Sequence, residues 1–137
     1  GSSGVTAEIA VGQGPKETNA LSLELGGGRV DFRPVSQLLL LAPGRYRFVG
    51  ASKGHLKGLR GLKWQIACLD ERSRAIGETS PFLGGSVGWT AFSAEFEIAA
   101  DCKAQILRLI LDARSTSETF VSGTFAFADL RILRDVQ

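Results

Sequence analysis

The residues that could do chemistry in this chain do not form a familiar catalytic set. Gly84-Gly-Ser-Val-Gly88 matches the G-x-S-x-G pattern of a hydrolase nucleophile elbow, which needs a strand before it, a helix after it and a histidine later in the chain. Here an alternating, strand-like segment follows, and the single histidine, His55, lies upstream. We therefore interpret residues 84–88 as a glycine-rich loop and His55 as a solvated loop residue rather than a general base or metal ligand.

Paired carboxylates are the second chemical possibility, because glycoside hydrolysis uses two carboxyl groups about 5–10 Å apart. Glu95 and Glu97 share one face of an expected strand, and Asp112 lies at the end of another. Acidic residues on the wet face of a sheet are usually solvated, and no arrangement of these three stands out. The sequence therefore favours a protein that is not an enzyme and leaves a glycan-active hydrolase as the weaker hypothesis.

A glycine-spaced segment, residues 52–61, and the strand start after it form a local basic cluster in a chain whose formal charge is only +2. Its basic residues are Lys53, His55, Lys57, Arg60 and Lys63. The cluster could hold an acidic sugar, a phosphate or an acidic protein, but we favour an ordinary solvated loop. The spacing of its glycines does not fit a nucleotide-binding loop. The small net charge also does not indicate a nucleic-acid partner.

Two tryptophans, Trp64 and Trp89, are the residues on which a sugar ring could stack. Trp64 alternates with apolar neighbours and Trp89 starts a strand, so core or edge packing competes with ligand stacking at both. Arg47, Gln65 and Arg108 lie on the polar faces of three expected strands. If those faces form one concave sheet, the guanidinium and amide groups would line it and bind sugar hydroxyls or carboxylates; otherwise they form an ordinary wet face.

The two cysteines, Cys68 and Cys102, lie near the ends of neighbouring expected strands. They could form a disulfide if their Cα atoms lie within about 7 Å. Two separate buried thiols are the alternative. With no third or fourth ligand beside them, they do not predict a zinc site.

The elements that must position these residues are strands. With 137 residues, 44% hydrophobic and 22% charged, the chain is globular. Alternating runs separated by turn residues recur every eight to twelve positions, which is typical of a sandwich or barrel. The expected strands are 5–11, 20–25, one beginning at 29–32, 36–41, 45–51, 62–69, 75–79, 90–98, 104–111 and 119–133, with turns at 26–28 and 43–44 and loops at 52–61 and 80–88.

Two of these runs show the alternation most clearly. After the Pro43-Gly44 turn, Tyr46 and Phe48 point to one side of the strand and Arg45 and Arg47 to the other. In the run 88–98 the residues Phe92 and Phe96 likewise alternate with polar ones. Because side chains alternate across a strand with a period of two, the aromatic residues are expected in the core and the polar residues outside.

The domain organisation is simple. Gly1-Ser-Ser-Gly4 resembles an expression scar, and residues 5–137 are expected to form a single domain. The apolar run 38–42 is too short to span a membrane, so no membrane insertion is expected. No signal peptide is recognised, but an isolated domain would lack its parent's signal, so the chain is not assigned to the cytoplasm on this ground.

Three motifs in order resemble the jelly-roll carbohydrate-binding modules appended to xylanases and cellulases, which belong to the galactose-binding-domain-like type. These motifs are Pro43-Gly-Arg-Tyr-Arg-Phe48, Trp89-Thr-Ala-Phe-Ser-Ala-Glu-Phe96 and Gly123-Thr-Phe-Ala-Phe-Ala-Asp-Leu-Arg-Ile132. Two further stretches, Trp64-Gln-Ile-Ala-Cys68 and Cys102-Lys-Ala-Gln105, are similar to those of a variant of these modules. That variant follows helical repeats in bacterial exported proteins.

The resemblance implies an all-β, two-sheet antiparallel jelly-roll β-sandwich. It implies a non-catalytic carbohydrate-binding module of an exported, periplasmic or extracellular bacterial protein, with a polysaccharide or glycan as partner. Arg47, Gln65, Arg108, Trp64 and Trp89 would then form the site.

The same resemblance has further implications. It favours a Cys68–Cys102 disulfide. No organic cofactor is implied, but some such modules carry a structural calcium ion, and Asp129 is the matching acidic position. The chain has one tyrosine and few aromatics outside the expected core, so an alternative stays open. This is a structural or protein-interaction domain of a larger, repeat-containing protein without sugar binding, which predicts an exposed apolar patch.

Overall fold

The computed structural model describes residues 5–10, 14–29, 35–112 and 120–135. Within these ranges the chain forms strands and a single 3-10 turn. The elements are β1 (Val5–Ala10), η1 (Pro15–Glu17), β2 (Ala20–Arg29), β3 (Ser36–Leu39), β4 (Gly44–Gly58), β5 (Leu62–Cys68), β6 (Ala75–Glu78), β7 (Gly84–Ile98), β8 (Gln105–Leu111) and β9 (Phe120–Arg134). None of the described helices is long and apolar enough to cross a membrane.

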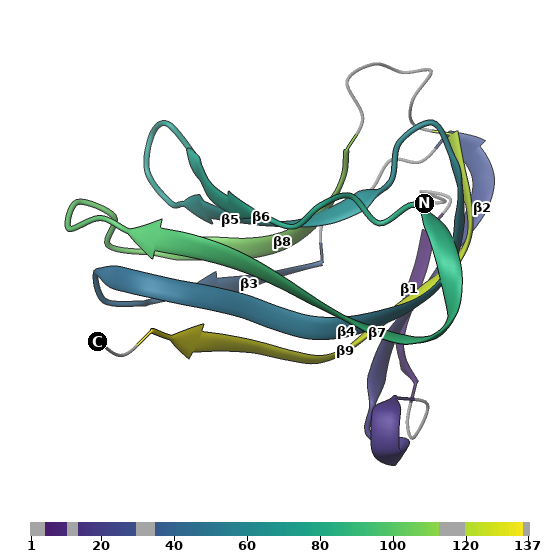
Figure 1. Cartoon of the computed structure of the whole chain (residues 1–137). Coiled ribbons are helices and arrows are strands. Elements are labelled where there is room, and N and C mark those ends of the chain that lie inside the picture. Colours follow the sequence, from purple (N-terminus) through teal and green to yellow (C-terminus); the bar gives the residue numbers. More distant parts are fainter. Residues whose placement is uncertain (1–4, 11–13, 30–34, 113–119, 136–137) are drawn as a thin grey trace.

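The strands form two antiparallel sheets packed face to face (Figure 1). One sheet has five strands in the order β1-β2-β9-β4-β7, and the other has four in the order β3-β8-β5-β6. Non-consecutive neighbours such as β9 and β4 mean that the chain crosses repeatedly between the sheets. The predicted all-β, two-sheet antiparallel sandwich is confirmed.

The core between the sheets is built by the alternation that the sequence shows. Tyr46, Phe48 and Phe96 are buried, as predicted, and Phe92 is half-buried against them. Phe48 packs edge-on against Trp64 of the opposite sheet, with ring centroids 5.6 Å apart. Burying each such side chain contributes about 1.5–3 kcal/mol, so these aromatic contacts hold the two sheets together.

Three segments that the sequence assigns to turns and loops are strands. β2 continues through Gly26–Gly28, β4 continues to Gly58, and β7 begins at Gly84. The cause is pairing with neighbours distant in sequence, because His55 lies opposite both Thr124 of β9 and Gly85 of β7. Glycine is a poor strand former in isolation, but β9 pairs with β2, β4 pairs with β7, and β4 itself is paired on both sides by β7 and β9.

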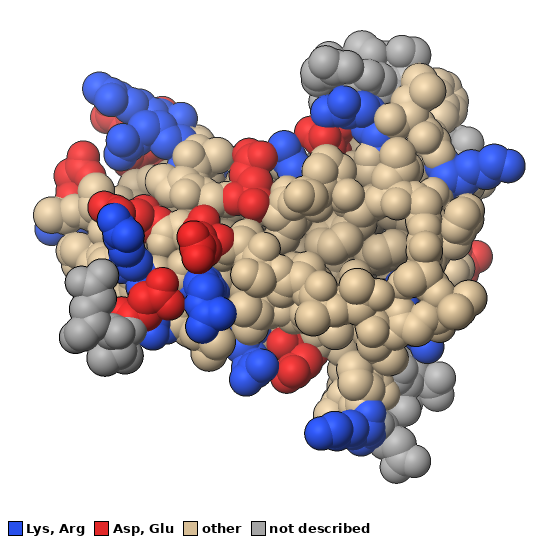
Figure 2. All heavy atoms as spheres, in the orientation of Figure 1, with Lys and Arg blue, Asp and Glu red and all other residues tan. Residues whose placement is uncertain are grey.

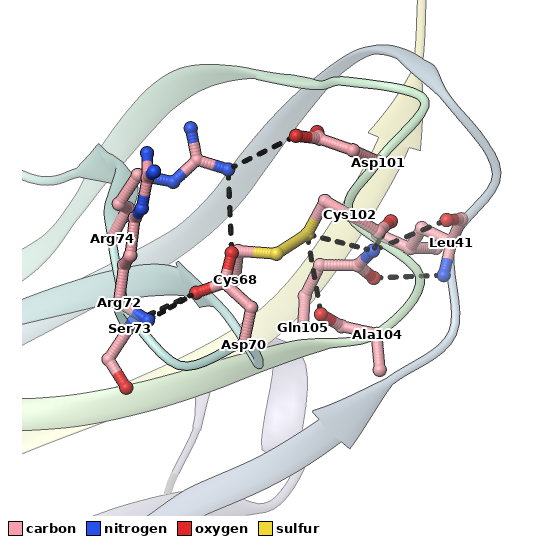
Figure 3. The surroundings of a disulfide bond; sticks show 10 residues. All are labelled: Leu41, Cys68, Asp70, Arg72, Ser73, Arg74, Asp101, Cys102, Ala104 and Gln105. Carbon is pink, nitrogen blue, oxygen red and sulfur yellow. Dashed lines mark hydrogen bonds and ion pairs between the residues drawn. A yellow bond between two sulfur atoms is a disulfide. The ribbon is translucent and has the colours of Figure 1, made fainter.

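A disulfide joins Cys68 at the end of β5 to Cys102 in the connection between β7 and β8, with 5.8 Å between the Cα atoms (Figure 3). Both cysteines are buried. The fully buried Gln105 closes the same region, since its Oε1 accepts a hydrogen bond from the Leu41 N–H at 2.9 Å and its Nε2 donates to the Cys102 carbonyl at 3.1 Å. The bridge therefore ties the strand ends of both sheets at one end of the sandwich.

Candidate functional site

The structure places the predicted site residues on two opposite faces of the sandwich. Arg47 lies on β4, between buried neighbours, and points away from the core on the outer face of the five-stranded sheet. Gln65 of β5 and Arg108 of β8 lie directly opposite one another on the outer face of the four-stranded sheet. The three therefore do not line one concave sheet, because β4 pairs with β7 and β9 while β5 pairs with β8.

The polar residues on the four-stranded sheet bind one another. Arg108 Nε donates to Gln65 Oε1 at 2.9 Å, and Gln65 Nε2 donates to Glu78 Oε1 at 2.9 Å. Lys63 Nζ lies 2.8 Å from Glu78 Oε2 and 3.1 Å from Asp112 Oδ1. A ligand on this face would have to break these contacts before forming its own.

The pairing also shifts the acidity of two of these groups. The hydrogen bond from Lys63 lowers the pKa of Glu78, and the hydrogen bond to Glu78 raises the pKa of Lys63. In both cases the ion pair outweighs burial, which favours the neutral form of each group. On the outer face of the four-stranded sheet these charged and polar side chains are therefore already paired with one another.

Trp64 is a core residue and offers no stacking surface. Its side chain is 2% exposed and packs edge-on against Phe48 and Phe127. The proposed ligand-stacking role of Trp64 is therefore wrong, for the reason that its alternation with Ile66 and Cys68 already indicated. Trp89, by contrast, is half-buried and lies on the outer face of the five-stranded sheet.

Trp89 owes its position to an irregular part of β7. Ser52 lies opposite Thr90 and Gly54 opposite Ser86, so three residues of β7, including Trp89, face the single residue Lys53 of β4. Such a bulge lets an edge strand project a side chain outward. The Lys53 ammonium lies 5.2 Å from the centre of the Trp89 ring, within the range of a cation–π contact.

A row of alanines crosses the same outer face from strand to strand. Ala20 of β2 lies opposite Ala128 of β9, Ala128 opposite Ala51 of β4, and Ala51 opposite Ala91 of β7. The register continues from Ala20 to Ala10 of β1. Directly opposed residues of antiparallel strands share a face. Ala20 and Ala128 are 2% and 3% exposed although they point away from the core, so neighbouring atoms cover most of their side chains.

In the next row along the strands, the residues of β2 and β9 are also small. Lys53 lies opposite Ala126, and Ala126 lies opposite Ser22. We call the combined surface the small-residue floor; it consists of Ala20, Ser22, Ala51, Ala91, Ala126 and Ala128. Together these residues leave a shallow surface with Trp89 and Lys53 standing on its β7 side.

Three hollows mark this face. One of about 220 Å³ lies over Ser22 and Ala126, and one of about 380 Å³ lies over Ala51, Ala91 and Arg131. The third, of about 530 Å³, is lined by Lys53, Gly54, His55, Gly85, Ser86, Val87 and Thr124. The first and third share Lys53, Gly54 and Thr124, so the two hollows adjoin one another. Sequence reasoning missed this site because it treated residues 52–61 as a loop; the alternation of Lys53, His55 and Lys57 was the available signal.

Another cavity, of about 470 Å³, opens between the sheets beside β3 and the last third of β9. It is lined mainly by apolar side chains such as Leu39, Leu130 and Ile132 and includes buried Trp64, whose Nε1 has no hydrogen-bond partner among the described residues. Its polar lining is limited to Ser36, Gln37 and Arg131. The cavity is therefore a mainly apolar slot between the sheets, separate from the hollows on the outer face.

The described part of the chain contains no assembled catalytic site of the two kinds that the sequence suggested. Ser86 Oγ donates to the Gly88 carbonyl at 2.9 Å and lies 3.3 Å from Thr90 Oγ1, with no hydrogen bond to His55. Asp112 binds Arg60 and Lys63 on the four-stranded sheet, whereas Glu97 pairs with Arg45 on the other sheet. These carboxylates therefore do not face one another across a groove.

Asp129, the position matched to a calcium ligand, is exposed and occupies a bulge in β9, where its φ is 55°. Its Oδ1 lies 3.5 Å from Arg131 Nε. The described residues include no group of three or more potential metal ligands around it or elsewhere. Calcium takes six to eight oxygen ligands, of which the described residues supply this one carboxylate, so a calcium ion at Asp129 stays a prediction.

The charged side chains gather toward the end of the sandwich that holds the C-terminus, and the middle of the molecule in this view is largely uncharged (Figure 2). At the charged end, Asp70 accepts hydrogen bonds from the Arg72 and Ser73 N–H groups, and Arg74 bridges Asp70 and Asp101 beside the disulfide (Figure 3). These contacts close the turn after β5 and are structural.

Comparison with known proteins gives a fold but no sequence family. No family model matches the chain, and no curated protein matches it either. Several solved structures match over nearly its whole length. One comprises the CBM22-1–GH10 modules of a Clostridium thermocellum endo-1,4-β-D-xylanase with xylohexaose (TM-score 0.62, 17% identity, 95% of this chain and 24% of that one). The chain thus spans about a quarter of that xylanase structure.

Two further matches cover most of both chains. A putative sugar-binding protein from Bacteroides thetaiotaomicron has a TM-score of 0.66 at 10% identity, over 97% of this chain and 83% of that one. The CBM22-1 xylan-binding domain of Paenibacillus barcinonensis Xyn10C has a TM-score of 0.60 at 12% identity, over 96% and 81%. At such low identities the likeness concerns the fold. It confirms the jelly-roll fold of carbohydrate-binding modules; the variant beside helical repeats stays a prediction.

Proposed function

We propose that this chain is a non-catalytic carbohydrate-binding module that takes a glycan on the outer face of its five-stranded sheet. The observation that carries the proposal is the small-residue floor, which crosses four strands in register and has the half-buried Trp89 at its side. A sugar ring is flat and polar at its rim, so it needs a smooth surface with an aromatic neighbour and hydrogen-bonding groups around it.

The residues around the floor supply those groups. Ser22 and Thr124 line the depression on the β2 side, and Ser93 and Arg131 line the hollow on the β7 side. Hydroxyls donate and accept, while the guanidinium only donates, so the set can bind sugar hydroxyls in either sense. Unlike Gln65 and Arg108, the hydroxyls of Ser22, Ser93 and Thr124 form no side-chain hydrogen bond in the described structure.

Two further observations support the proposal. Neighbours in fold include a xylan-binding domain and a xylanase module pair with a bound xylo-oligosaccharide. The Cys68–Cys102 disulfide is of a kind that persists in oxidising compartments, which supports a periplasmic or extracellular setting.

Binding to a panel of neutral and acidic polysaccharides, by affinity electrophoresis and titration calorimetry, tests the proposal. We expect the wild type to bind at least one polymer and Trp89→Ala to weaken that binding on the order of tenfold, about 1.4 kcal/mol. Arg108→Ala, on the opposite face, is the matched control and should bind as the wild type does. Loss in Arg108→Ala but not in Trp89→Ala would move the site to the other sheet, and no binding to any polymer would overturn the proposal.

One observation favours the second candidate function, an interaction domain without sugar binding. Leu38, Leu40 and Leu69 are 59%, 75% and 46% exposed, at the disulfide end of the four-stranded sheet. We propose a second copy of this chain as the partner, because its binding can be measured with the purified chain alone. In sedimentation velocity, concentration-dependent dimerisation lost in Leu38→Glu but kept in Leu59→Glu would support this function. A monomer at every concentration would count against it.

A further inference from the structure

Three basic side chains follow one another along the outer face of β4. Lys53, His55 and Lys57 occupy alternate positions, and the intervening Leu56 is buried in the core. Successive side chains on one face of a strand are about 6.6 Å apart, so the three form a stripe rather than the solvated loop that their glycine-rich sequence predicts.

None of the three has an acidic partner within the described residues. Six other cations form ion pairs there: Arg45, Arg47, Arg60, Lys63, Arg74 and Arg131. The acid nearest in register is Glu24 of β2, which lies opposite Thr124, itself opposite His55. Two strand spacings separate Glu24 from His55, about 10 Å, and no carboxylate of the described residues forms an ion pair with the stripe.

The stripe borders a depression that glycines keep open. Gly54 and Gly85 lie in the 530 Å³ hollow with Lys53 and His55, and a Cβ on Gly85 would meet His55 Nδ1 at 2.8 Å and the Gly54 carbonyl more closely still. Ser86 and Thr124 stand at its rim with hydroxyl groups. The hollow thus combines space, hydroxyl groups and positive charge without an acidic partner in the described residues, next to Lys53 and its neighbour Trp89.

We infer that this hollow takes the carboxylate or sulfate group of an anionic polysaccharide, whose ring lies against Trp89 and the small-residue floor. Lys53 supplies the charge nearest the indole, and His55 supplies an N–H donor in either protonation state. Lys57 extends the stripe toward the next acidic group of the polymer. The inference rests on the proposed function and names its ligand class.

The test compares polymers that differ only in charge. Polygalacturonate and its carboxyl-reduced form make one arm, and a sulfated galactan and its desulfated form make the other. We expect one anionic polymer to bind at least tenfold more tightly than its neutral counterpart and the preference to weaken between 50 and 500 mM salt, roughly as screening increases. Lys53→Gln/His55→Gln should abolish the preference, so that the charged and neutral forms bind with equal affinity. Lys103→Gln, which removes an exposed charge in the connection before β8, should leave the preference unchanged.

The outcomes separate the two proposals. Equal binding of charged and neutral forms would overturn this inference and leave the proposed function intact, whereas no binding to either form would count against both. A single-stranded oligonucleotide bound as tightly as the polysaccharide would also overturn the inference, because the face would then be a non-selective anion surface. Circular dichroism of the double variant checks that its fold is unchanged.

Discussion

The ammonium group of Lys53 lies 5.2 Å from the centre of the Trp89 ring, and the two residues come from neighbouring strands of the five-stranded sheet. A contact of this kind at an exposed site is worth about 0.5–1 kcal/mol. It holds the indole beside the small-residue floor and places a positive charge next to the more exposed of the two tryptophans, since Trp64 is buried. The pair thus joins an aromatic surface and a charge in one site.

The different burial of the two tryptophans predicts a difference in fluorescence quenching. Acrylamide should quench Trp89 readily and Trp64 poorly, because Trp64 is 2% exposed. Trp89→Phe leaves only the buried indole, so we expect its emission to be blue-shifted and resistant to quenching. A Trp89→Phe protein quenched as strongly as the wild type would contradict the core position of Trp64.

The disulfide is expected to contribute substantially to stability. Cys68 and Cys102 are 34 positions apart, and closing a loop of that length in the unfolded chain is worth about 3–4 kcal/mol in the chain-entropy account. Denaturant unfolding with and without reductant measures the difference, and intact mass verifies the bridge. The Cys68→Ser/Cys102→Ser variant should have the same free energy of unfolding as the reduced protein, and reductant should not change it. If reductant lowered the stability of that variant, the loss of stability in the wild type would have another cause.

Gly54 should tolerate no side chain. Its φ is +129°, and a Cβ there would meet the Thr124 carbonyl and lie 2.7 Å from the Phe125 Cα, both of them backbone. Strain and crowding together predict that Gly54→Ala lowers the free energy of unfolding by about 2–4 kcal/mol. Gly88→Ala is the matched control in the same sheet, because no atom lies within 4 Å of its Cβ position. We expect that change to stay within about 0.5 kcal/mol, and equal effects at both sites would contradict the packing described here.

The Lys63–Glu78 pair predicts a loss of stability in acid. Lys63 holds the pKa of Glu78 below its usual value of 4.5, so the folded state releases this proton more readily than the unfolded chain does. The resulting stabilisation is complete above pH 4.5 and is lost as the pH falls through the lowered pKa. The difference in unfolding free energy between the wild type and Glu78→Gln should therefore be present at pH 7 and vanish in strong acid. Glu71→Gln, an exposed acid without an ion pair in the described structure, should show no such pH-dependent difference.

The local alternation of the chain already determined the sandwich. Tyr46, Phe48 and Phe96 are buried where their parity predicted, because the two-residue period of a strand depends only on the neighbours along the chain. The same rule identified Trp64 as a core candidate and put Arg47, Gln65 and Arg108 on wet faces.

The tertiary structure alone decided which wet faces belong together and where the strands end. Arg47 and Arg108 look equivalent in sequence, yet strand order puts them on opposite sides of the molecule. The alanine row exists only through the register of β2, β9, β4 and β7, and no local signal connects residues 20, 51, 91 and 128. One stripe of basic side chains contains Lys53, His55 and Lys57, because the glycine-rich segment that carries them pairs with β7 and β9 as a strand. Long-range backbone hydrogen bonds outweighed the local preference of glycine for turns, and this pairing is a property of the whole sheet.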